Sequence, residues 1–136
     1  MVYITRKEHF SSSHKLFNPN LTAEKNKAIF DKCYNTHGHN YYLEVTLVGE
    51  PSPESGYVMD FKGMKSIIHK EIINKVDHTH LNDLEMFKDK ILTAEIMVEI
   101  FWNILENKLR RENSRLYSLR LYETDNNYVE YKGSAS

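Results

Sequence analysis

The stretch YYLEVTLV, residues 41–48, decides the fold of this chain. Its apolar residues Leu43, Val45 and Leu47 fall on one side of an extended backbone, and Tyr42 and the other polar residues fall on the opposite side. This alternation is typical of a strand with one buried face. Turn-forming residues follow directly after it, so the strand is expected to end there.

Two helices are predicted beyond this strand. Asp60 can cap the first, in which apolar residues recur at helical spacing to about Val76. The second follows Thr93 and carries an apolar stripe wide enough to lie on a sheet. On the N-terminal side, residues 18–26 are polar and turn-rich, and an apolar patch follows at residues 28–30. That region is predicted to be a loop carrying one short helix.

Three further segments are predicted to be strands. Residues 2–10 alternate, although Arg6 and Glu8 weaken the apolar side. Leu119 and Leu121 begin a strand and residues 128–131 form another, with a polar hairpin turn between them. The order strand, strand, helix, helix, strand, strand predicts an α+β fold in which two helices cover one face of an antiparallel sheet.

The composition indicates one soluble domain. The chain has 136 residues, of which 40% are hydrophobic and 27% charged, with 18 basic and 19 acidic side chains. This size suits one core, so residues 1–133 are expected to form a single domain and residues 134–136 a polar tail. Near-neutral charge provides no overall field for nucleic acid or an anionic membrane, and no signal-peptide core is seen. We expect a cytoplasmic protein without nucleic-acid or membrane partners.

Histidines are the clearest candidates for chemistry. His37 and His39 are two residues apart at the entry to the central strand, so both imidazoles project from one face and can share a metal. His14 follows the first strand and is the best candidate for a third ligand. Three histidines with one open position are typical of catalytic zinc. The alternative is that His37 and His39 are only polar side chains at a strand entry.

Cys33 and the pair Asp77-His78 leave alternatives open. The thiolate of Cys33 could close a structural zinc site with His37 and His39, or the thiol could be buried and inert. Asp77 could orient the imidazole of His78 and raise its basicity, or both residues could belong to a solvated loop.

Two glutamates are candidate ligand-binding residues. Glu123 shares the side of Leu119 and Leu121, so its carboxylate is expected to point toward the covered face, where it needs a partner. A flat heterocycle with an amino group and a ring N–H would supply two donors, and Arg or Lys would serve equally well. Glu95, at the start of the second helix, could simply complement the helix dipole.

Taken together, five motifs in this order resemble the 6-pyruvoyl-tetrahydropterin synthase family, which includes the 6-carboxytetrahydropterin synthases of queuosine biosynthesis. The resemblance runs from about residue 3 to residue 133. It rests on Phe10-Ser11-Ser12-Ser13-His14, Cys33 with His37-Gly38-His39-Asn40, Asp77-His78, Thr93-Ala94-Glu95 and Tyr122-Glu123-Thr124-Asp125-Asn126-Asn127.

The resemblance implies a tunnelling fold, with a four-stranded antiparallel sheet, two helices on one side, and sheets joined into a barrel. The assembly it implies is a homohexamer, a dimer of trimers. It further implies a zinc-dependent lyase acting on 7,8-dihydroneopterin triphosphate. The residue roles it implies are Zn²⁺ binding by His14, His37 and His39, proton transfer by Cys33 with Asp77 and His78 of a neighbouring subunit, and pterin binding by Thr93, Glu95 and Glu123.

Two features point to different branches of this family. Three residues separate Cys33 from His37, which resembles the carboxy branch, whereas residues 21–32 and 122–127 resemble the pyruvoyl branch. Because loop length sets where the thiolate lies, we predict formation of 6-carboxy-5,6,7,8-tetrahydropterin with loss of acetaldehyde and triphosphate. The alternative is a 6-pyruvoyl-tetrahydropterin synthase that releases triphosphate in tetrahydrobiopterin biosynthesis. A second alternative is a non-catalytic metal- or pterin-binding domain.

Overall fold

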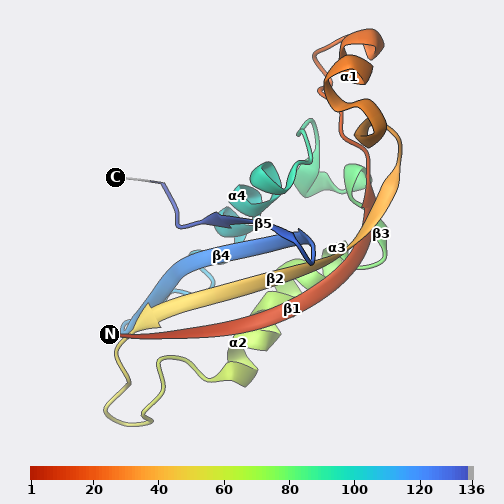
Figure 1. Cartoon of the computed structure of the whole chain (residues 1–136). Helices are drawn as coiled ribbons and strands as arrows, with labels where there is room; N and C mark the ends of the chain where they lie inside the picture. Colours follow the sequence, from red (N-terminus) through yellow and green to blue (C-terminus); the bar gives the residue numbers. More distant parts are fainter. Residues whose placement is uncertain (135–136) are drawn as a thin grey trace.

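A curved five-stranded sheet forms the centre of the computed structural model, which describes residues 1–134 (Figure 1). The strand order is β3-β1-β2-β4-β5. All neighbouring strands are antiparallel except β3, which runs parallel to β1. The strand bounds are β1 Val2–His14, β2 His37–Gly49, β3 Thr79–His80, β4 Ser114–Thr124 and β5 Asn127–Tyr131. Positions 135–136 of the predicted tail lie outside the described residues.

The prediction of a four-stranded, purely antiparallel sheet was wrong, because the sheet is mixed and has a fifth strand. The addition is β3, whose two residues pair with Ser12 and Ser13 of β1. A strand of this length is too short to show alternation, so periodicity gives no signal for it. The α+β class and the antiparallel pairing of β1, β2, β4 and β5 were predicted.

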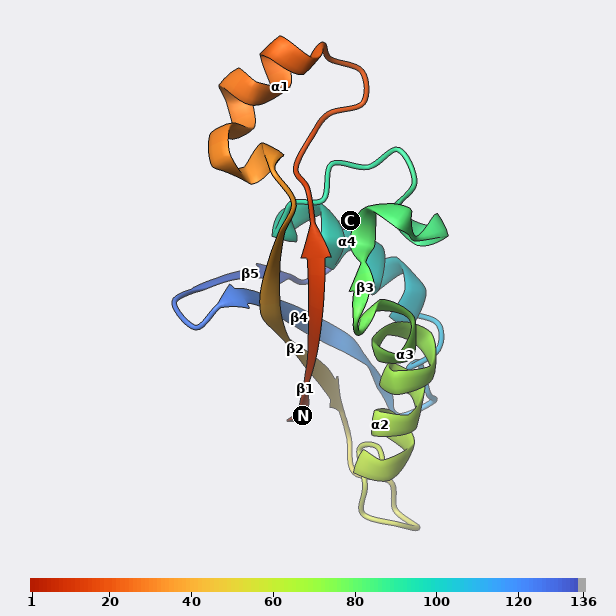
Figure 2. The same cartoon turned by 90° about the vertical axis from the view of Figure 1, so that its right-hand side faces the viewer.

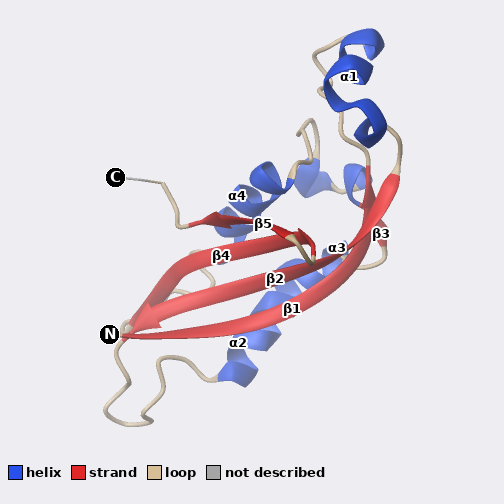
Figure 3. Ribbon diagram, in the orientation of Figure 1, coloured by secondary structure: helices blue, strands red, loops and turns tan. Residues whose placement is uncertain are grey.

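Helices cover one face of this sheet (Figures 2 and 3). The first covering helix runs through α2 Phe61–Ile68, a π-helical turn His69–Ile73 and α3 Asn74–Val76, and the second is α4 Ala94–Leu105. A third helix, α1 Ala23–Phe30, projects from the end of the sheet outside this layer (Figure 1). The two predicted covering helices are confirmed, and the short helix of the predicted loop is α1. Within residues 1–134, no helix combines the length and apolar character needed to cross a membrane.

Local sequence signals explain where the covering helices begin. The Asp60 side chain accepts a hydrogen bond from the Lys62 N–H at 3.2 Å, and the Thr93 hydroxyl accepts one from the Ile96 N–H at 3.3 Å. These are N-caps that satisfy amides without an intrahelical partner. The apolar side of β2 packs against these helices, and Leu43, Val45 and Leu47 are fully buried there, as the alternation predicted.

The pairing of β1 with β2 extends further than predicted. It runs without interruption to the pair His14 and His37, four residues past the predicted end of the first strand at Phe10. In this register Ser12 faces His39 across the ladder. Because the extension adds polar residues to an apolar strand, hydrophobic periodicity underestimates it. The consequence is that three histidines reach the same end of the sheet.

Candidate active site

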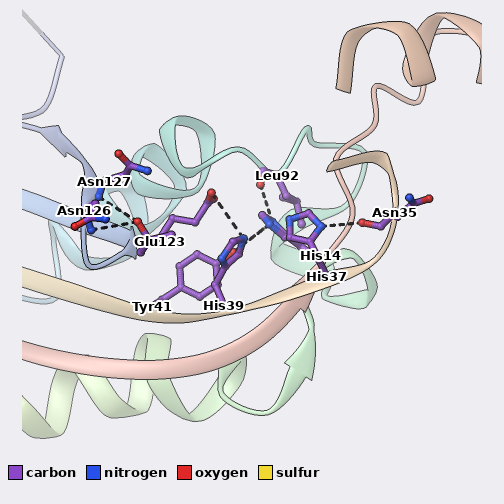
Figure 4. Close-up of polar contacts among 10 residues, drawn as sticks. His14, Asn35, His37, His39, Tyr41, Leu92, Glu123, Asn126 and Asn127 are labelled. Carbon is purple, nitrogen blue, oxygen red and sulfur yellow. Dashed lines mark hydrogen bonds and ion pairs between the residues drawn. The ribbon is translucent and has the colours of Figure 1, made fainter. Parts of the chain in front are cut away.

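His14, His37 and His39 form one cluster at the end of the β1–β2 ladder (Figure 4). One nitrogen from each lies within 4.8 Å of those of the other two. The ring centroids are 4.6 Å apart for His14 and His37, 5.0 Å for His37 and His39, and 5.2 Å for His14 and His39. Direct pairing of His14 with His37, and the two-residue step to His39, place all three on the helix-covered face.

Backbone carbonyl groups orient two of these rings. Nδ1 of His14 lies 3.0 Å from the Leu92 carbonyl oxygen, and Nδ1 of His37 lies 2.7 Å from that of Asn35. A carbonyl can only accept, so each Nδ1 carries the proton in these bonds and each Nε2 keeps its lone pair. Such contacts to the second ring nitrogen are what fixes the tautomer of metal-binding histidines.

The electrostatics of His14 favour its neutral form. The ring is fully buried, and burial is the main reason why its pKa falls to about 4, with further lowering by His37 and His39. The hydrogen bond to Leu92 opposes this shift. At neutral pH the imidazole therefore has a free lone pair, which is the form that binds metal ions.

His39 supplies the sharpest indication of a missing partner. Its Nε2 is buried and has no hydrogen-bond partner among the described residues, and the nearest carboxylate oxygen, Oε1 of Glu123, is 3.7 Å away. Burial lowers the pKa of His39, and Glu123 partly opposes that shift. A buried polar atom without a partner is costly. Three imidazoles with these properties fit Zn²⁺ with one position left for another ligand.

Glu123 reaches the cluster because of a bulge in β4. The β4–β5 ladder pairs Tyr122 with Tyr128 and Thr124 with Asn127, so Glu123 is an extra residue between two regular pairs. Bulges redirect side chains and are common beside functional sites. The Glu123 carboxylate points toward His39, on the covered side that the sequence predicted (Figure 4).

A cavity of about 180 Å³ adjoins the cluster through Glu123. The three residues predicted to bind a pterin, Thr93, Glu95 and Glu123, all contribute to its wall. Apolar side chains form much of the rest, so a flat ring with polar edges would find both packing surface and hydrogen-bond acceptors. The lining residues are Leu16, Thr93, Ala94, Glu95, Leu121, Glu123, Asn127, Tyr128 and Val129.

Tyr41 is part of the site but was not singled out from the sequence. It is fully buried, and its hydroxyl lies 3.3 Å from Nδ1 and 3.4 Å from Nε2 of His14. Burial, assisted by Glu123, raises the pKa of Tyr41, so the phenol stays neutral. Its parity with His37 and His39 in the same strand was the available signal.

The structure brings Asp77 and His78 together at the edge of β1. Oδ2 of Asp77 lies 3.1 Å from Nδ1 of His78, and Oδ1 accepts a hydrogen bond from the Ser11 N–H at 2.9 Å. The Ser11 bond is the main reason why the pKa of Asp77 lies below its ordinary value. His78 has φ of 59°, a left-handed conformation in which its side chain is 83% exposed. The pair is therefore preformed and accessible.

Cys33 lies outside the histidine cluster. It is an exposed free thiol on the 3-10 turn Asp31–Tyr34, which rules out the buried, inert thiol considered above. The Leu16 N–H donates to the Cys33 carbonyl at 2.8 Å, which holds this turn beside the end of β1. The three-residue group of metal-ligand atoms does not include Cys33. Its position suits a reactive group better than a ligand of a closed zinc site.

Fold and site together define a class of α+β protein in which a strand pair presents three histidines beside a small-molecule cavity. A model of the 6-pyruvoyl tetrahydropterin synthase family matches residues 3–134. The solved 6-pyruvoyl tetrahydropterin synthase of Caenorhabditis elegans superposes with a TM-score of 0.83 at 36% identity, covering 98% of this chain and 96% of that one.

Curated relatives agree with this match. The 6-pyruvoyl tetrahydrobiopterin synthase of Dictyostelium discoideum is 39% identical over 97% of this chain and 96% of its own length. The 6-carboxy-5,6,7,8-tetrahydropterin synthase of Aquifex aeolicus is 29% identical over 95% and 96%. The chain belongs to the 6-pyruvoyl tetrahydropterin synthase family and, as predicted, is a lyase of that family.

Proposed function

We propose that this chain is a zinc-dependent 6-pyruvoyl-tetrahydropterin synthase, which converts 7,8-dihydroneopterin triphosphate to 6-pyruvoyl-tetrahydropterin and releases triphosphate. The observation that carries the proposal is the position of Glu123, which lines the cavity and also lies 3.7 Å from Nε2 of His39. If Glu123 holds the pterin ring of the substrate, the side chain of the substrate lies next to the histidine cluster. This is the geometry that a metal-assisted reaction on that side chain requires.

The choice of product rests on the relatives. The 39% identity to a pyruvoyl enzyme against 29% to a carboxy enzyme supports the pyruvoyl reaction, which was the alternative to our sequence-based preference. That preference depended on the short spacing between Cys33 and His37. Spacing alone is a weak guide to the thiol position, because the turn that carries Cys33 is held at Leu16 as well as through the contact between Asn35 and His37.

Zinc binding is assigned to His14, His37 and His39. Zinc held there would supply a Lewis acid that acidifies C–H and O–H groups of the substrate side chain. The chain fixes the ligands beforehand, since the Leu92 and Asn35 carbonyls already hold two of the three rings. Such preorganisation lowers the cost of binding the ion.

Glu95 and Glu123 are assigned to the pterin ring, with Thr93 in the same wall of the cavity. Carboxylates accept from the amino group and ring N–H of a pterin in bidentate geometry. The apolar part of the wall, including Leu121 and Val129, would contact the ring face and exclude water.

Cys33, Asp77 and His78 are assigned to proton transfer. The thiolate of Cys33 would remove a proton from the substrate side chain. Asp77 accepts from Nδ1 of His78, which leaves the His78 Nε2 free to exchange a proton with the thiol. Moving these protons from the side chain to the ring oxidises a side-chain carbinol to a carbonyl and reduces the ring to the tetrahydro level, so the two electrons come from the substrate itself and no external reductant is needed.

We further propose that this triad forms between subunits of a homohexamer, with Asp77 and His78 coming from the neighbour of the chain that supplies Cys33. Support comes from the edge of β1, where β3 pairs with only Ser12 and Ser13. Ser11 on the same edge bonds Asp77 and His78, and residues 2–10 of this edge offer backbone groups to another sheet, as joining of sheets into a barrel requires.

Mass spectrometry of the products tests the proposed reaction. Zinc-loaded protein is incubated with 7,8-dihydroneopterin triphosphate, beside a chelated sample. We expect 6-pyruvoyl-tetrahydropterin and free triphosphate in the zinc-loaded sample and neither product in the chelated one. The appearance of 6-carboxytetrahydropterin with acetaldehyde would support the carboxy branch instead. No conversion by a folded, zinc-containing protein would support the non-catalytic alternative.

A further inference from the structure

Residues 79–82 hold the end of β1. Here β3 pairs with Ser12 and Ser13, and the Ser13 hydroxyl lies 2.8 Å from Nδ1 of His80. The segment begins directly after His78. One short piece of chain therefore connects the proposed proton-transfer pair with the strand that carries His14.

Within this segment, the side chain of Asn82 makes two hydrogen bonds with the backbone of Lys15. Its Oδ1 accepts from the Lys15 N–H at 2.8 Å, and its Nδ2 donates to the Lys15 carbonyl at 3.0 Å. The β1–β2 ladder ends at His14, so Lys15 has no strand partner for these two groups. The side-chain amide of Asn82 replaces both hydrogen bonds that a neighbouring strand would have made.

Lys15 lies between two groups whose separation matters for the proposed reaction. On one side is His14, whose ring is fixed by the Leu92 carbonyl. On the other is Leu16, whose N–H holds the Cys33 carbonyl at 2.8 Å. The Lys15 ammonium also lies 4.2 Å from the ring centre of Tyr34, in the turn that carries the thiol. Any backbone shift at Lys15 would move the imidazole and the thiol relative to each other.

We propose that Asn82 is a positioning residue that clamps Lys15 and thereby sets the geometry between the metal-binding His14 and the Cys33 turn. The inference rests on the proposed function and assigns a role to a residue outside the zinc ligands, the thiol and the pterin-binding carboxylates. Asn82 does not contact His14 itself but holds the backbone next to it. Loss of contacts that orient metal ligands typically changes metal affinity or activity by about 10–100-fold, which sets the upper range for this residue.

The test compares Asn82→Ala with a matched variant, Asn113→Ala. Asn113 also donates to backbone carbonyls, those of Glu50, Tyr57 and Val58, but at the opposite end of the sheet. We expect Asn82→Ala to weaken zinc binding, measured by competition with a chelator, by about 10–100-fold. Asn113→Ala should lower the melting temperature and leave zinc affinity unchanged.

Two further readouts separate positioning from general destabilisation. In Asn82→Ala, the absorption spectrum of the Co²⁺-substituted protein and the rate of Cys33 alkylation by iodoacetamide should both change. Asn82→Asp keeps the acceptor for the Lys15 N–H but sets a carboxylate oxygen against the Lys15 carbonyl, so its zinc affinity should also fall below that of the wild type. This second variant also tests the proposal if Asn82→Ala does not fold.

The proposal would be overturned if Asn82→Ala folds and its zinc affinity, Co²⁺ spectrum and Cys33 alkylation rate all equal those of the wild type. Because these measurements need no substrate, they are independent of the product assay. If the wild-type chain binds zinc but forms neither pterin product, the proposed reaction is refuted. The comparison of zinc affinity between the wild type and the Asn82 variants then still tests the role of Asn82. A wild-type chain that binds no zinc would overturn both.

Discussion

Two histidine–glutamate pairs lie on the same face of the sheet, His69 with Glu8 and His39 with Glu123, and only the first is joined by a hydrogen bond. Nε2 of His69 lies 2.6 Å from Oε2 of Glu8, and the other carboxylate oxygen of Glu8 accepts from Arg6 at 2.7 Å. Nε2 of His39 lies 3.7 Å from Glu123 and has no hydrogen-bond partner among the described residues. The residue types are the same, but only the first pair is complete.

The pair of Glu8 and His69 links β1 to the helical segment that carries His69. Glu8 is only 8% exposed, and its two oxygens are both satisfied. A buried carboxylate with a partner on each oxygen has no unmet need for a ligand. The incomplete pair at His39 lies beside a cavity and two other imidazoles, so its missing interaction is available to a metal ion or substrate. An unsatisfied site is therefore the better guide to function.

Replacing one histidine of each pair should give the largest contrast. His39→Ala is expected to lose its zinc and at least about 10³-fold of kcat/KM, because several kcal/mol of Lewis-acid stabilisation disappear. His69→Ala should retain about one zinc per chain and lose about 1–3 kcal/mol of unfolding free energy, because Glu8 loses a partner. Metal analysis, kinetics and chemical denaturation measure these effects. Equal zinc content in the two variants would show that His39 contributes no more to metal binding than His69 does.

Cys33→Ala sharpens the comparison by removing chemistry without removing a ligand. We expect zinc content to be unchanged and kcat to fall about 10²–10⁴-fold, which is the usual contribution of a positioned acid or base. Elemental analysis beside a turnover assay checks both parts. Loss of zinc in this variant would instead show that the thiol is a metal ligand.

A mixing experiment tests whether Asp77 and His78 act across a subunit boundary. Cys33→Ala and His78→Ala should each be nearly inactive alone. When the two are unfolded together and reassembled in equal amounts, random association restores about a quarter of the sites if the triad spans two chains. The recovered activity is measured against wild-type protein treated in the same way. No recovery, with normal assembly, would place the triad within one chain.

The smallest effect is expected in the pH dependence of stability, at Glu8. Burial raises the pKa of Glu8, but hydrogen bonds from Arg6 and His69 outweigh it, so the pKa lies below the ordinary value of 4.5. The folded state thus binds this proton less readily than the unfolded state. The carboxylate contributes stability above pH 4.5 that is lost as the pH falls below it.

Glu8→Gln should therefore be less stable than the wild type at neutral pH, by about 1–3 kcal/mol. The difference between the two proteins should shrink as the pH falls from 4.5 toward the folded-state pKa of Glu8. Urea denaturation at a series of pH values measures it. A constant difference over this range would show that the charge of Glu8 does not contribute.

Much of the fold could be predicted because its signals are local. The alternation around Leu43 located the central strand, and Asp60 and Thr93 marked two helix starts that the structure reproduces. The fifth strand was missed because Thr79 and His80 pair over only two residues. Their pairing depends on where the preceding helix ends, which local periodicity does not report.

In the candidate site, the three histidines could be predicted from the sequence, but Tyr41 and Asn82 could not. The spacing of His37 and His39 indicated a shared face, and His14 was a reasonable third member. Tyr41 was missed because a tyrosine in a buried strand is normally a packing residue. Asn82 gave no signal at all, since its importance lies in two backbone groups of a distant residue, Lys15.

The sequence by itself determined which residue types are available and which face of a strand or helix they share, because these follow from periods of two and 3.6 residues. Only the tertiary structure decided that His14 stands opposite His37, that a bulge turns Glu123 toward His39, and that the carbonyls of Leu92 and Asn35 orient the rings. The physical reason is that register, bulges and loop contacts are settled by the simultaneous satisfaction of backbone groups across the whole sheet.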